Sequence, residues 1–167
     1  MTDQILTQAL LQSLFTYNPI TGIVIRKITV NPNAKAGDIV GTIDNGYLRV
    51  AISNKTYQLH RIIWFMKYGY FPKTIDHKNR NRSDNRFCNL REATYIENNK
   101  NIGICKNNTS GFNGVSFDKE RNAWEAFIGY NGKKKTLGRF PTKNLAIQAR
   151  KKANIAFDYH PNHGITL

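Results

Sequence analysis

The fold is decided by residues 74–94, which are TIDHKNRNRSDNRFCNLREAT. Asn, Arg and Asp dominate this stretch, and apolar residues such as Ile75 and Leu90 stand near its two flanks. The composition predicts a strand, a long polar loop and a second strand. Thr94 and Glu97 have the spacing of a capping box, which predicts a helix that begins at about residue 95. The expected order is therefore strand, loop, strand, helix.

Three polar residues of this unit suit phosphodiester hydrolysis, which needs an activated water, a base and a cation. Asp76 offers a hard carboxylate oxygen for magnesium. His77 titrates near neutral pH and can act as the base. Asn98, in the first turn of the expected helix, offers a second oxygen. Adjacent strand residues point to opposite faces, so Asp76 and His77 share a site only if the strand ends or bulges there.

The same stretch resembles the HNH homing-type endonucleases of bacteriophages and their mobile introns, which have the ββα-metal fold. The resemblance covers about residues 47–101 and rests on LHRIIW, then Asp-His, Asp-Asn-Arg and Asn-Leu-Arg. It implies that His77 is the general base and that Asp76 is a metal ligand. It also implies that Asn89 braces the loop and orients the base.

The resemblance places the second metal ligand at Asn98, where the family often has His. An all-oxygen pair of ligands favours Mg²⁺, with Mn²⁺ as a substitute. No structural zinc is expected, because Cys88 and Cys105 alone do not supply four ligands. A disulfide between these two cysteines is not expected either, since the chain is expected to be intracellular.

Several residues of the stretch also allow a plainer interpretation. Arg91 is expected either to bind DNA by contacting the scissile phosphate or only to form an ion pair with Glu92 or Glu97. His60 fits a hydrogen-bonded core histidine as well as a site residue. Cys88 is expected to be a small buried side chain. Three further residues are typical of loop turns rather than of metal ligands: Asn79, Asn81 and Asn85.

The charge of the chain points to a polyanion as partner. Lys and Arg number 25 against 11 Asp and Glu, a net charge of +14. Residues 1–59 hold 5 basic and 3 acidic side chains, whereas residues 60–108 and 109–159 each hold 10 and 4. Nucleic acid is the first candidate and an acidic membrane surface the second. No block of five like charges occurs, which favours two adjoining basic surfaces over a disordered tail.

The C-terminal segment predicts a small sheet covered by one helix. Strands are expected at 114–117, 123–130 and 133–140, with turns at 118–122 and 131–132. Thr142 is expected to cap the helix. Its apolar stripe is expected to comprise Leu145, Ala149, Ala153, Ala156 and Phe157. Its opposite, solvent-facing side is expected to comprise Arg150, Lys151 and Lys152.

This segment, over about residues 110–159, resembles the ethylene-response-factor (Apetala-two) type of DNA-binding domain. The matching features are Gly-Val, Trp-x-Ala-x-Ile, Leu-Gly-x-Phe-x-Thr and the Ala-rich helix. The resemblance implies that the sheet lies in the major groove of double-stranded DNA. Trp124 is expected in the core. The residues expected to contact DNA are Arg121, Lys133, Lys134, Thr136 and Arg139.

The N-terminal part predicts a helix and a β-meander. Asp3 is expected to cap a helix that contains Ile5, Leu6, Ala9, Leu10 and Phe15. Strands are expected at 22–27, 38–43, 46–53 and 55–60, and a buried helix at 61–70. Asn45-Gly46 is a strong hairpin signal. No apolar run approaches the ~20 residues of a membrane span, and no secretory signal is recognised.

Together these patterns predict an α+β chain of four segments: 1–59, a helix and meander; 60–104, the HNH unit; 105–110, a linker; and 111–167, a DNA-binding domain. The expected function is metal-dependent DNA cleavage by a monomer or weak homodimer in the host bacterial cytoplasm, with no membrane partner. The alternatives are a non-catalytic DNA-binding regulator and a protein that binds or cleaves RNA.

Overall fold

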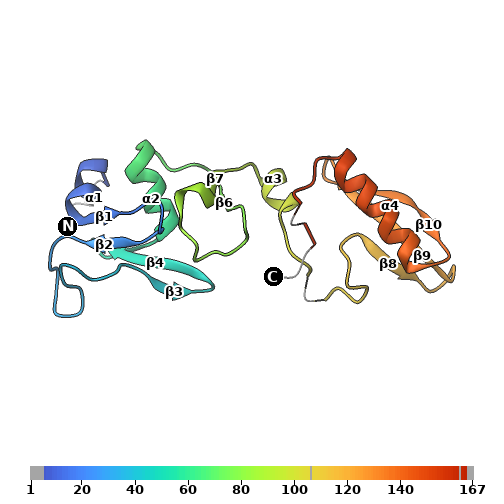
Figure 1. The fold of residues 1–167 in the computed structure, drawn as a ribbon, viewed down its shortest axis with the longest axis horizontal. Helices are drawn as coiled ribbons and strands as arrows, with labels where there is room; N and C mark the ends of the chain where they lie inside the picture. Colours follow the sequence, from blue (N-terminus) through green and yellow to red (C-terminus); the bar gives the residue numbers. More distant parts are fainter. Residues whose placement is uncertain (1–5, 106, 162, 165–167) are drawn as a thin grey trace. The chain divides into compact units, whose positions relative to one another are not determined.

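Short strands separated by turns alternate with four helices over the described residues, which gives a mixed α/β structure with several small sheets (Figure 1). The computed structural model describes residues 6–105, 107–161 and 163–164. The chain divides into two units, residues 1–94 and 95–167. The predicted α+β class is confirmed, whereas the four predicted segments stay predictions.

The first helix, α1 (Gln8–Leu14), begins at Thr7, whose hydroxyl accepts a hydrogen bond of 3.1 Å from the Leu10 backbone NH. Asp3 and Ile5 lie outside the described residues. The prediction that Phe15 belongs to the helix is wrong. Phe15 has extended backbone angles and starts β1 (Phe15–Tyr17), which pairs with β2 (Val24–Arg26). Phe15 is 2% exposed and belongs to the core cluster of the first unit.

The predicted meander forms a three-stranded antiparallel sheet of order β3-β4-β5. Asn45 and Gly46 both have positive φ, 49° and 81°, as a two-residue hairpin turn requires. The strand expected at 38–43 is shorter than predicted. The bounds of the three strands are β3 Thr42–Asp44, β4 Tyr47–Ile52 and β5 Lys55–Gln58.

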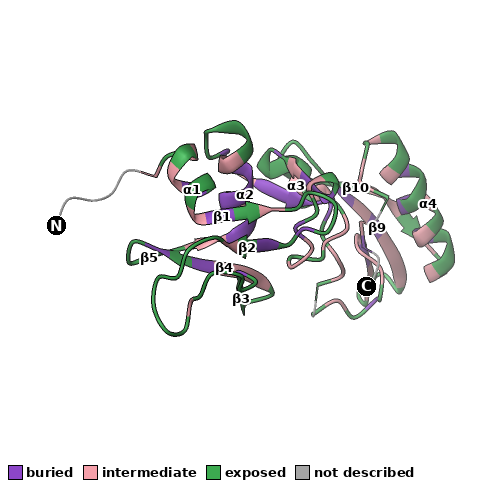
Figure 2. Ribbon diagram, turned by 60° about the vertical axis from the view of Figure 1, so that its left-hand side comes forward, coloured by how far each residue is buried: buried purple, intermediate pink, exposed green. Residues whose placement is uncertain are grey.

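The buried helix α2 (Leu59–Tyr68) holds the core of the first unit together (Figure 2). Ile62 and Ile63 are fully buried and pack in one cluster with residues of α1, β2 and β4. Gly69 ends the helix in the left-handed conformation, with φ 78°. The helix thus begins two residues before the predicted position, which places His60 on it.

In the second unit, α4 covers one face of a three-stranded sheet of order β10-β9-β8. Val115, Ala126 and Ala146 form its buried centre. The predicted cap is confirmed, since the Thr142 hydroxyl accepts a hydrogen bond from the Leu145 backbone NH. The bounds are α3 Tyr95–Lys100, β8 Val115–Asp118, β9 Ala123–Tyr130, β10 Lys133–Phe140 and α4 Lys143–Ala156.

The predicted faces of α4 are wrong at three positions. Leu145 is 43% exposed and Ala156 is exposed too, although both were expected in the apolar stripe. Arg150, expected to face solvent, is only 2% exposed. The guanidinium donates to the Asn113 backbone oxygen at 3.2 Å and lies near His163. Arg150 therefore ties the helix to the segment before β8. The buried residues of α4 are Ala146, Arg150 and Ala153, which are spaced about one helical turn apart.

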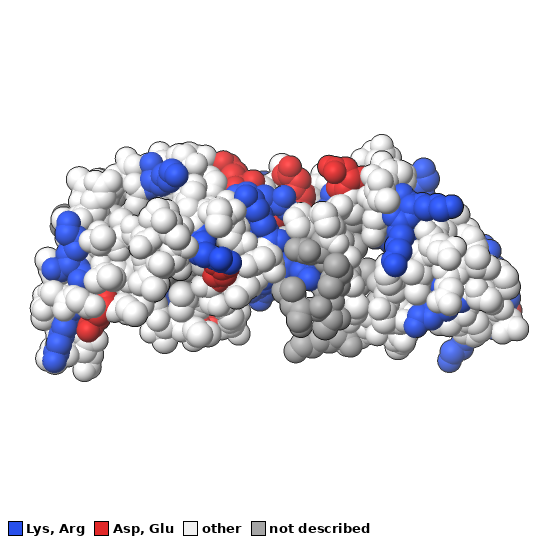
Figure 3. All heavy atoms as spheres, in the orientation of Figure 1, with Lys and Arg blue, Asp and Glu red and all other residues white. Residues whose placement is uncertain are grey.

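Lys and Arg side chains are spread over both units on the face seen in Figure 3. Within the part of the chain that the structure describes, no helix has the length and apolar character of a membrane span.

Candidate active site

The strand–loop–strand pattern folds as predicted. β6 (Ile75–His77) pairs antiparallel with β7 (Leu90–Glu92), and a short 3₁₀ helix, η1 (Phe87–Asn89), leads into β7. All three residues of β6 are buried. The strand ends at His77, so the chain can turn away directly after it.

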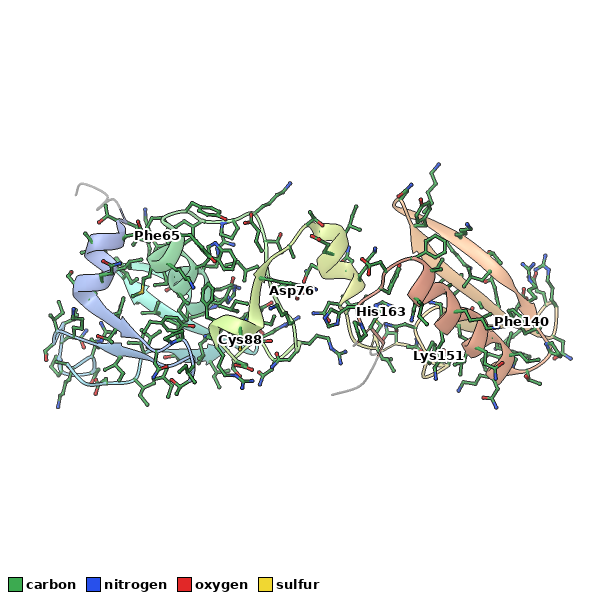
Figure 4. The ribbon with its side chains drawn as sticks, turned by 45° about the horizontal axis from the view of Figure 1, so that its top comes forward. Phe65, Asp76, Cys88, Phe140, Lys151 and His163 are labelled. Carbon is green, nitrogen blue, oxygen red and sulfur yellow. The ribbon has the colours of Figure 1, made fainter. Side chains whose placement is uncertain are left out.

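Asp76 is 6% exposed, and its partner is Arg91, the residue opposite it in the sheet (Figure 4). The Arg91 Nε and Nη2 atoms lie 2.9 and 2.7 Å from the Asp76 Oδ2 atom. A buried carboxylate without a neighbouring cation would be costly, and the Arg91 guanidinium supplies that cation. The structure thus gives Arg91 a partner that differs from the two glutamates considered in the sequence.

His77 is 4% exposed, and its ring is held from two sides. Its Nε2 atom lies 3.2 Å from the Asn85 Oδ1 atom. The His60 ring meets it edge-on, with 4.9 Å between the ring centroids. Burial lowers the pKa of His77 below its usual 6.5, because desolvation disfavours the imidazolium, although the Asn85 hydrogen bond opposes this effect. The imidazole is therefore neutral at physiological pH, as a base must be.

His60 is a core histidine that also borders the site. Its side chain is 3% exposed, and its Nδ1 atom is buried with no hydrogen-bond partner among the described residues. The Tyr47 ring lies 5.4 Å away between centroids. Burial, with the nearby His77, lowers the pKa of His60 to about 3. His60 is thus a core residue, as one of the two interpretations expected, but its neutral ring packs against His77 instead of being held by a hydrogen bond at Nδ1.

Asn89 spans the loop between the two strands. Its Oδ1 atom accepts a hydrogen bond of 2.9 Å from the Asn79 backbone NH. Its Nδ2 atom donates one of 2.8 Å to the Asp84 backbone oxygen. The Lys78 backbone NH bonds to the Asn89 backbone oxygen at 2.9 Å. These bonds support the bracing role that the family resemblance implies.

The other loop asparagines divide into two kinds. Asn79 accepts from the Asn81 backbone NH, and Asn81 accepts from Ser83, so both are loop-turn residues as predicted. Asn85 is different, since it is 2% exposed and contacts His77. Sequence reasoning missed this role because nothing in the loop's polar pattern separates a buried Asn from an exposed one.

Cys88 is exposed, so the prediction that it is buried is wrong. It lies on η1, a single turn whose Phe87 and Asn89 side chains take the inward positions. Cys105 is also exposed, and neither of the two cysteines forms a disulfide.

Asn98 lies on α3 of the second unit. Its convergence with Asp76 therefore stays a prediction. Over the described ranges, no three His, Cys, Asp or Glu residues come together as a group that could hold a metal ion.

The sheet of the second unit exposes the face opposite α4. Paired residues of an antiparallel sheet share a face. Thr136 pairs with Phe127 and Arg139 with Glu125, which places both on the exposed face beside Lys134. Lys133 pairs with Tyr130, whose ring packs on Phe157 after the helix. Lys133 therefore lies on the other face of the sheet from Lys134, Thr136 and Arg139.

Two carboxylates lie among these basic side chains. Arg121 and Arg139 both approach Asp118, at 3.2 and 3.4 Å. The Lys134 Nζ atom lies 2.6 Å from the Glu125 Oε2 atom. This hydrogen bond from Lys134 lowers the pKa of Glu125, so the acid is ionised at neutral pH. The exposed face is thus a network of alternating charges rather than a uniformly basic surface.

Comparison with known proteins identifies the first site. Residues 57–100 match the family model described as HNH endonuclease. These residues are thus similar to an HNH endonuclease domain, and the antiparallel β6–β7 pair followed by α3 agrees with a ββα arrangement. A protein of Escherichia phage T7, named "Protein 3.8", is 38% identical over 76 residues, which are 44% of this chain and 63% of that protein. The chain thus matches less than two thirds of this relative. No solved structure matches the chain significantly.

Proposed function

We propose that the chain is a metal-dependent DNA endonuclease of the phage HNH homing type. The observation that carries the proposal is a buried His77 next to Asp76, itself paired with Arg91, in a segment that matches the HNH family. His77 removes the proton from the water that attacks the phosphodiester. Family resemblance favours products with 5′-phosphate and 3′-hydroxyl ends. With one such centre among the described residues of each chain, a monomer would cut one strand and a weak homodimer both.

The donor set fits a hard divalent cation. The Asp76 carboxylate and the Asn98 amide oxygen are both oxygen ligands, which suit Mg²⁺ or Mn²⁺. A cation held by Asp76 and Asn98 would supply a Lewis acid for the phosphate and the leaving oxygen.

Arg91 has two roles in this proposal. Its guanidinium compensates the Asp76 charge, and its side chain remains 32% exposed. A guanidinium that reaches the surface beside the site can contact a phosphate oxygen of the bound strand. Arg91 is therefore a DNA-binding residue as well as a partner of the metal ligand.

The second unit is the proposed DNA-binding domain of the ethylene-response-factor type. Its exposed sheet face presents Lys134, Thr136 and Arg139, with Arg121 in the adjacent turn. Phosphate groups would compete with Asp118 and Glu125 for these cations. Lys133 is proposed to contact DNA only from the end of the β9–β10 hairpin.

Plasmid cleavage tests the proposed function against its alternatives. Supercoiled DNA incubated with Mg²⁺ is expected to become nicked or linear, and a chelator is expected to stop the reaction. Tight binding without any metal-dependent cutting would favour the non-catalytic regulator. Preferred cleavage of a matched RNA strand would favour the RNA enzyme.

The pH dependence of cleavage is expected to show an acidic limb with its midpoint below pH 6.5. The base must be neutral, and burial lowers the pKa of His77, so the imidazole stays active to a lower pH than a free one. The pKa of His60 is about 3, so His60 does not change its charge between pH 4.5 and 8.5 and does not contribute to this limb. Initial rates at saturating Mg²⁺ between pH 4.5 and 8.5 measure the limb.

The same lowered pKa means that the unfolded chain binds more protons than the folded chain just below pH 6.5. Stability therefore also declines as the pH falls through this window. Circular dichroism at each pH separates unfolding from loss of the base. A midpoint above pH 6.5 in a folded protein would contradict the assignment of His77.

The double variant Lys134→Ala/Arg139→Ala is expected to bind duplex DNA more weakly at low salt. Its plot of log affinity against log salt should be shallower by roughly 1–2, since each lost phosphate contact removes about 0.9 from the slope. Fluorescence anisotropy with a labelled duplex measures both quantities. Lys151→Ala/Lys152→Ala, which removes two exposed charges from α4 on the other side of the sheet, is the matched control and should have the smaller effect. Equal effects of the two double variants would contradict binding through the exposed face.

A further inference from the structure

Four aromatic side chains gather at the C-terminal end of α2. Between ring centroids, Trp64 lies 4.8 Å from Tyr68 and 5.9 Å from Phe87. The Tyr68 ring in turn lies 5.9 Å from Phe87 and 6.2 Å from Tyr70. We call these four residues, Trp64, Tyr68, Tyr70 and Phe87, the aromatic platform. They come from α2, the turn after it and η1, so only the folded chain brings them together.

The platform is buried at one end and open to solvent at the other. Trp64 is 6% exposed and belongs to the core cluster of the first unit. Tyr68 and Tyr70 are 48% and 46% exposed. The Tyr70 hydroxyl donates a hydrogen bond of 2.7 Å to the Glu92 Oε2 atom, which raises the pKa of Tyr70. Two tyrosine rings are thus held side by side with surface left for a ligand.

A cation lies over the same rings. The Lys67 Nζ atom is 3.8 Å from the centroid of the Phe87 ring and 5.8 Å from that of Tyr68. The Lys67 side chain is exposed, and its segment, residues 60–108, holds 10 basic and 4 acidic side chains. An apolar partner would have to bury the ammonium group, which is costly. A nucleic-acid strand offers both a phosphate for the cation and flat bases for the rings.

The platform is aligned with the candidate active site along α2. His60, Trp64 and Tyr68 follow one another at intervals of four residues, so they lie along one side of the helix. His60 packs against His77. The eight residues from His60 to Tyr68 rise about 12 Å. This rise corresponds to roughly three to four nucleotides of one strand at about 3.4 Å each.

We propose that the aromatic platform binds unpaired bases of the DNA strand, so that the protein prefers DNA with an unpaired stretch roughly three to four nucleotides from the cut. This inference rests on the proposed function and deepens it, because it names the DNA structure that the site takes. Bases of a paired duplex stack on one another, so their faces are accessible only where pairing is broken. The Tyr68 and Tyr70 rings then replace the lost stacking.

Binding is measured first, in the presence of a chelator, so that no DNA is cut. Fluorescence anisotropy with a labelled single strand and with its duplex compares the wild type with Tyr68→Leu, which removes the ring and keeps an apolar side chain. We expect single-strand binding to weaken at least about fivefold, since one stacked base contributes that much or more. Duplex binding should stay within about twofold.

Phe117→Leu is the matched control for the loss of an exposed ring. Phe117 is 44% exposed and packs beside Trp124 in the second unit, outside the platform. Its replacement should change neither single-strand nor duplex binding. Thermal unfolding followed by circular dichroism shows for each variant that the chain is folded.

Lys67→Gln tests the cation without removing a ring. For single strands, the plot of log affinity against log salt should become shallower by about 0.7, the value for one lost phosphate contact. Because the Lys67 side chain is exposed, the melting temperature should not change. An unchanged slope would contradict the phosphate contact that the proposal assigns to Lys67.

Cleavage with Mg²⁺ then compares a duplex that the wild type cuts with the same duplex carrying a short mismatched bubble, placed roughly three to four nucleotides from the cut. The wild type is expected to cut the bubble substrate at least about fivefold faster at subsaturating protein, and Tyr68→Leu to lose this preference. The inference is overturned if a folded Tyr68→Leu binds single strands like the wild type, or if it loses single-strand and duplex binding equally. Tighter binding of the matched RNA strand than of the DNA strand would also overturn it.

The outcomes for the inference and for the proposed function are distinct. A wild type that cuts paired and bubbled duplexes at the same rate contradicts the inference and leaves the proposed function intact. A wild type that binds single strands through Tyr68 but cuts no DNA with any divalent metal overturns the proposed function alone.

Discussion

The His77→Ala variant is expected to cleave DNA about 10²–10⁴-fold more slowly than the wild type, the usual contribution of a general base. Neutral imidazole is the only group in β6 that can take a proton near pH 7. Binding of DNA should change little, since the proposed contacts lie elsewhere. Single-turnover cleavage with saturating protein and Mg²⁺ measures the loss in the chemical step.

Because His77 is buried, its replacement also leaves a cavity. His77→Gln is the control, since glutamine fills most of the space and can still bond to Asn85. Both variants should lose activity to a similar extent, whereas His77→Gln should retain more stability in thermal unfolding. Wild-type rates in a folded His77→Gln protein would require another base.

The Asp76→Asn variant is expected to lose roughly 100-fold or more in cleavage at low millimolar Mg²⁺. A Lewis acid is worth several kcal/mol in the transition state, and each ~1.4 kcal/mol is a factor of ten in rate. The amide keeps the shape of the side chain but weakens the ligand. Rates as a function of Mg²⁺ concentration should show a higher metal requirement and partial recovery at high concentration.

Removing this charge also leaves Arg91 without its ion pair, so the measurement needs a matched control. Asp44→Asn breaks the comparable but exposed pair with Arg49 and is expected to leave cleavage within about twofold, since exposed pairs contribute little. An Asp76→Asn protein with unchanged rate and metal dependence would contradict the assignment of Asp76 as ligand.

Most of the order of elements could be predicted, because local signals set it. The Asn45-Gly46 hairpin, the Thr142 cap and the strands at 123–130 and 133–140 all form where the sequence placed them. The polar stretch after Ile75 likewise forms β6, a loop and β7. Turn and cap residues act through their own backbone and their near neighbours, so they need no knowledge of distant segments.

The environment of each site residue was decided by the tertiary structure. The sequence predicted the Asp76–His77 pair as a site, and the family resemblance added Asn89 as the residue that braces the loop. It did not show that Arg91 pairs with Asp76, that His60 packs on His77, or that Asn85 is buried. Those relations depend on strand register and on the β1–β2 hairpin, which lies about 65 residues earlier in the chain and packs on Asn85. Residue type gives the chemistry a side chain can perform, whereas burial and partners, which arise only when remote segments meet, fix its charge and orientation.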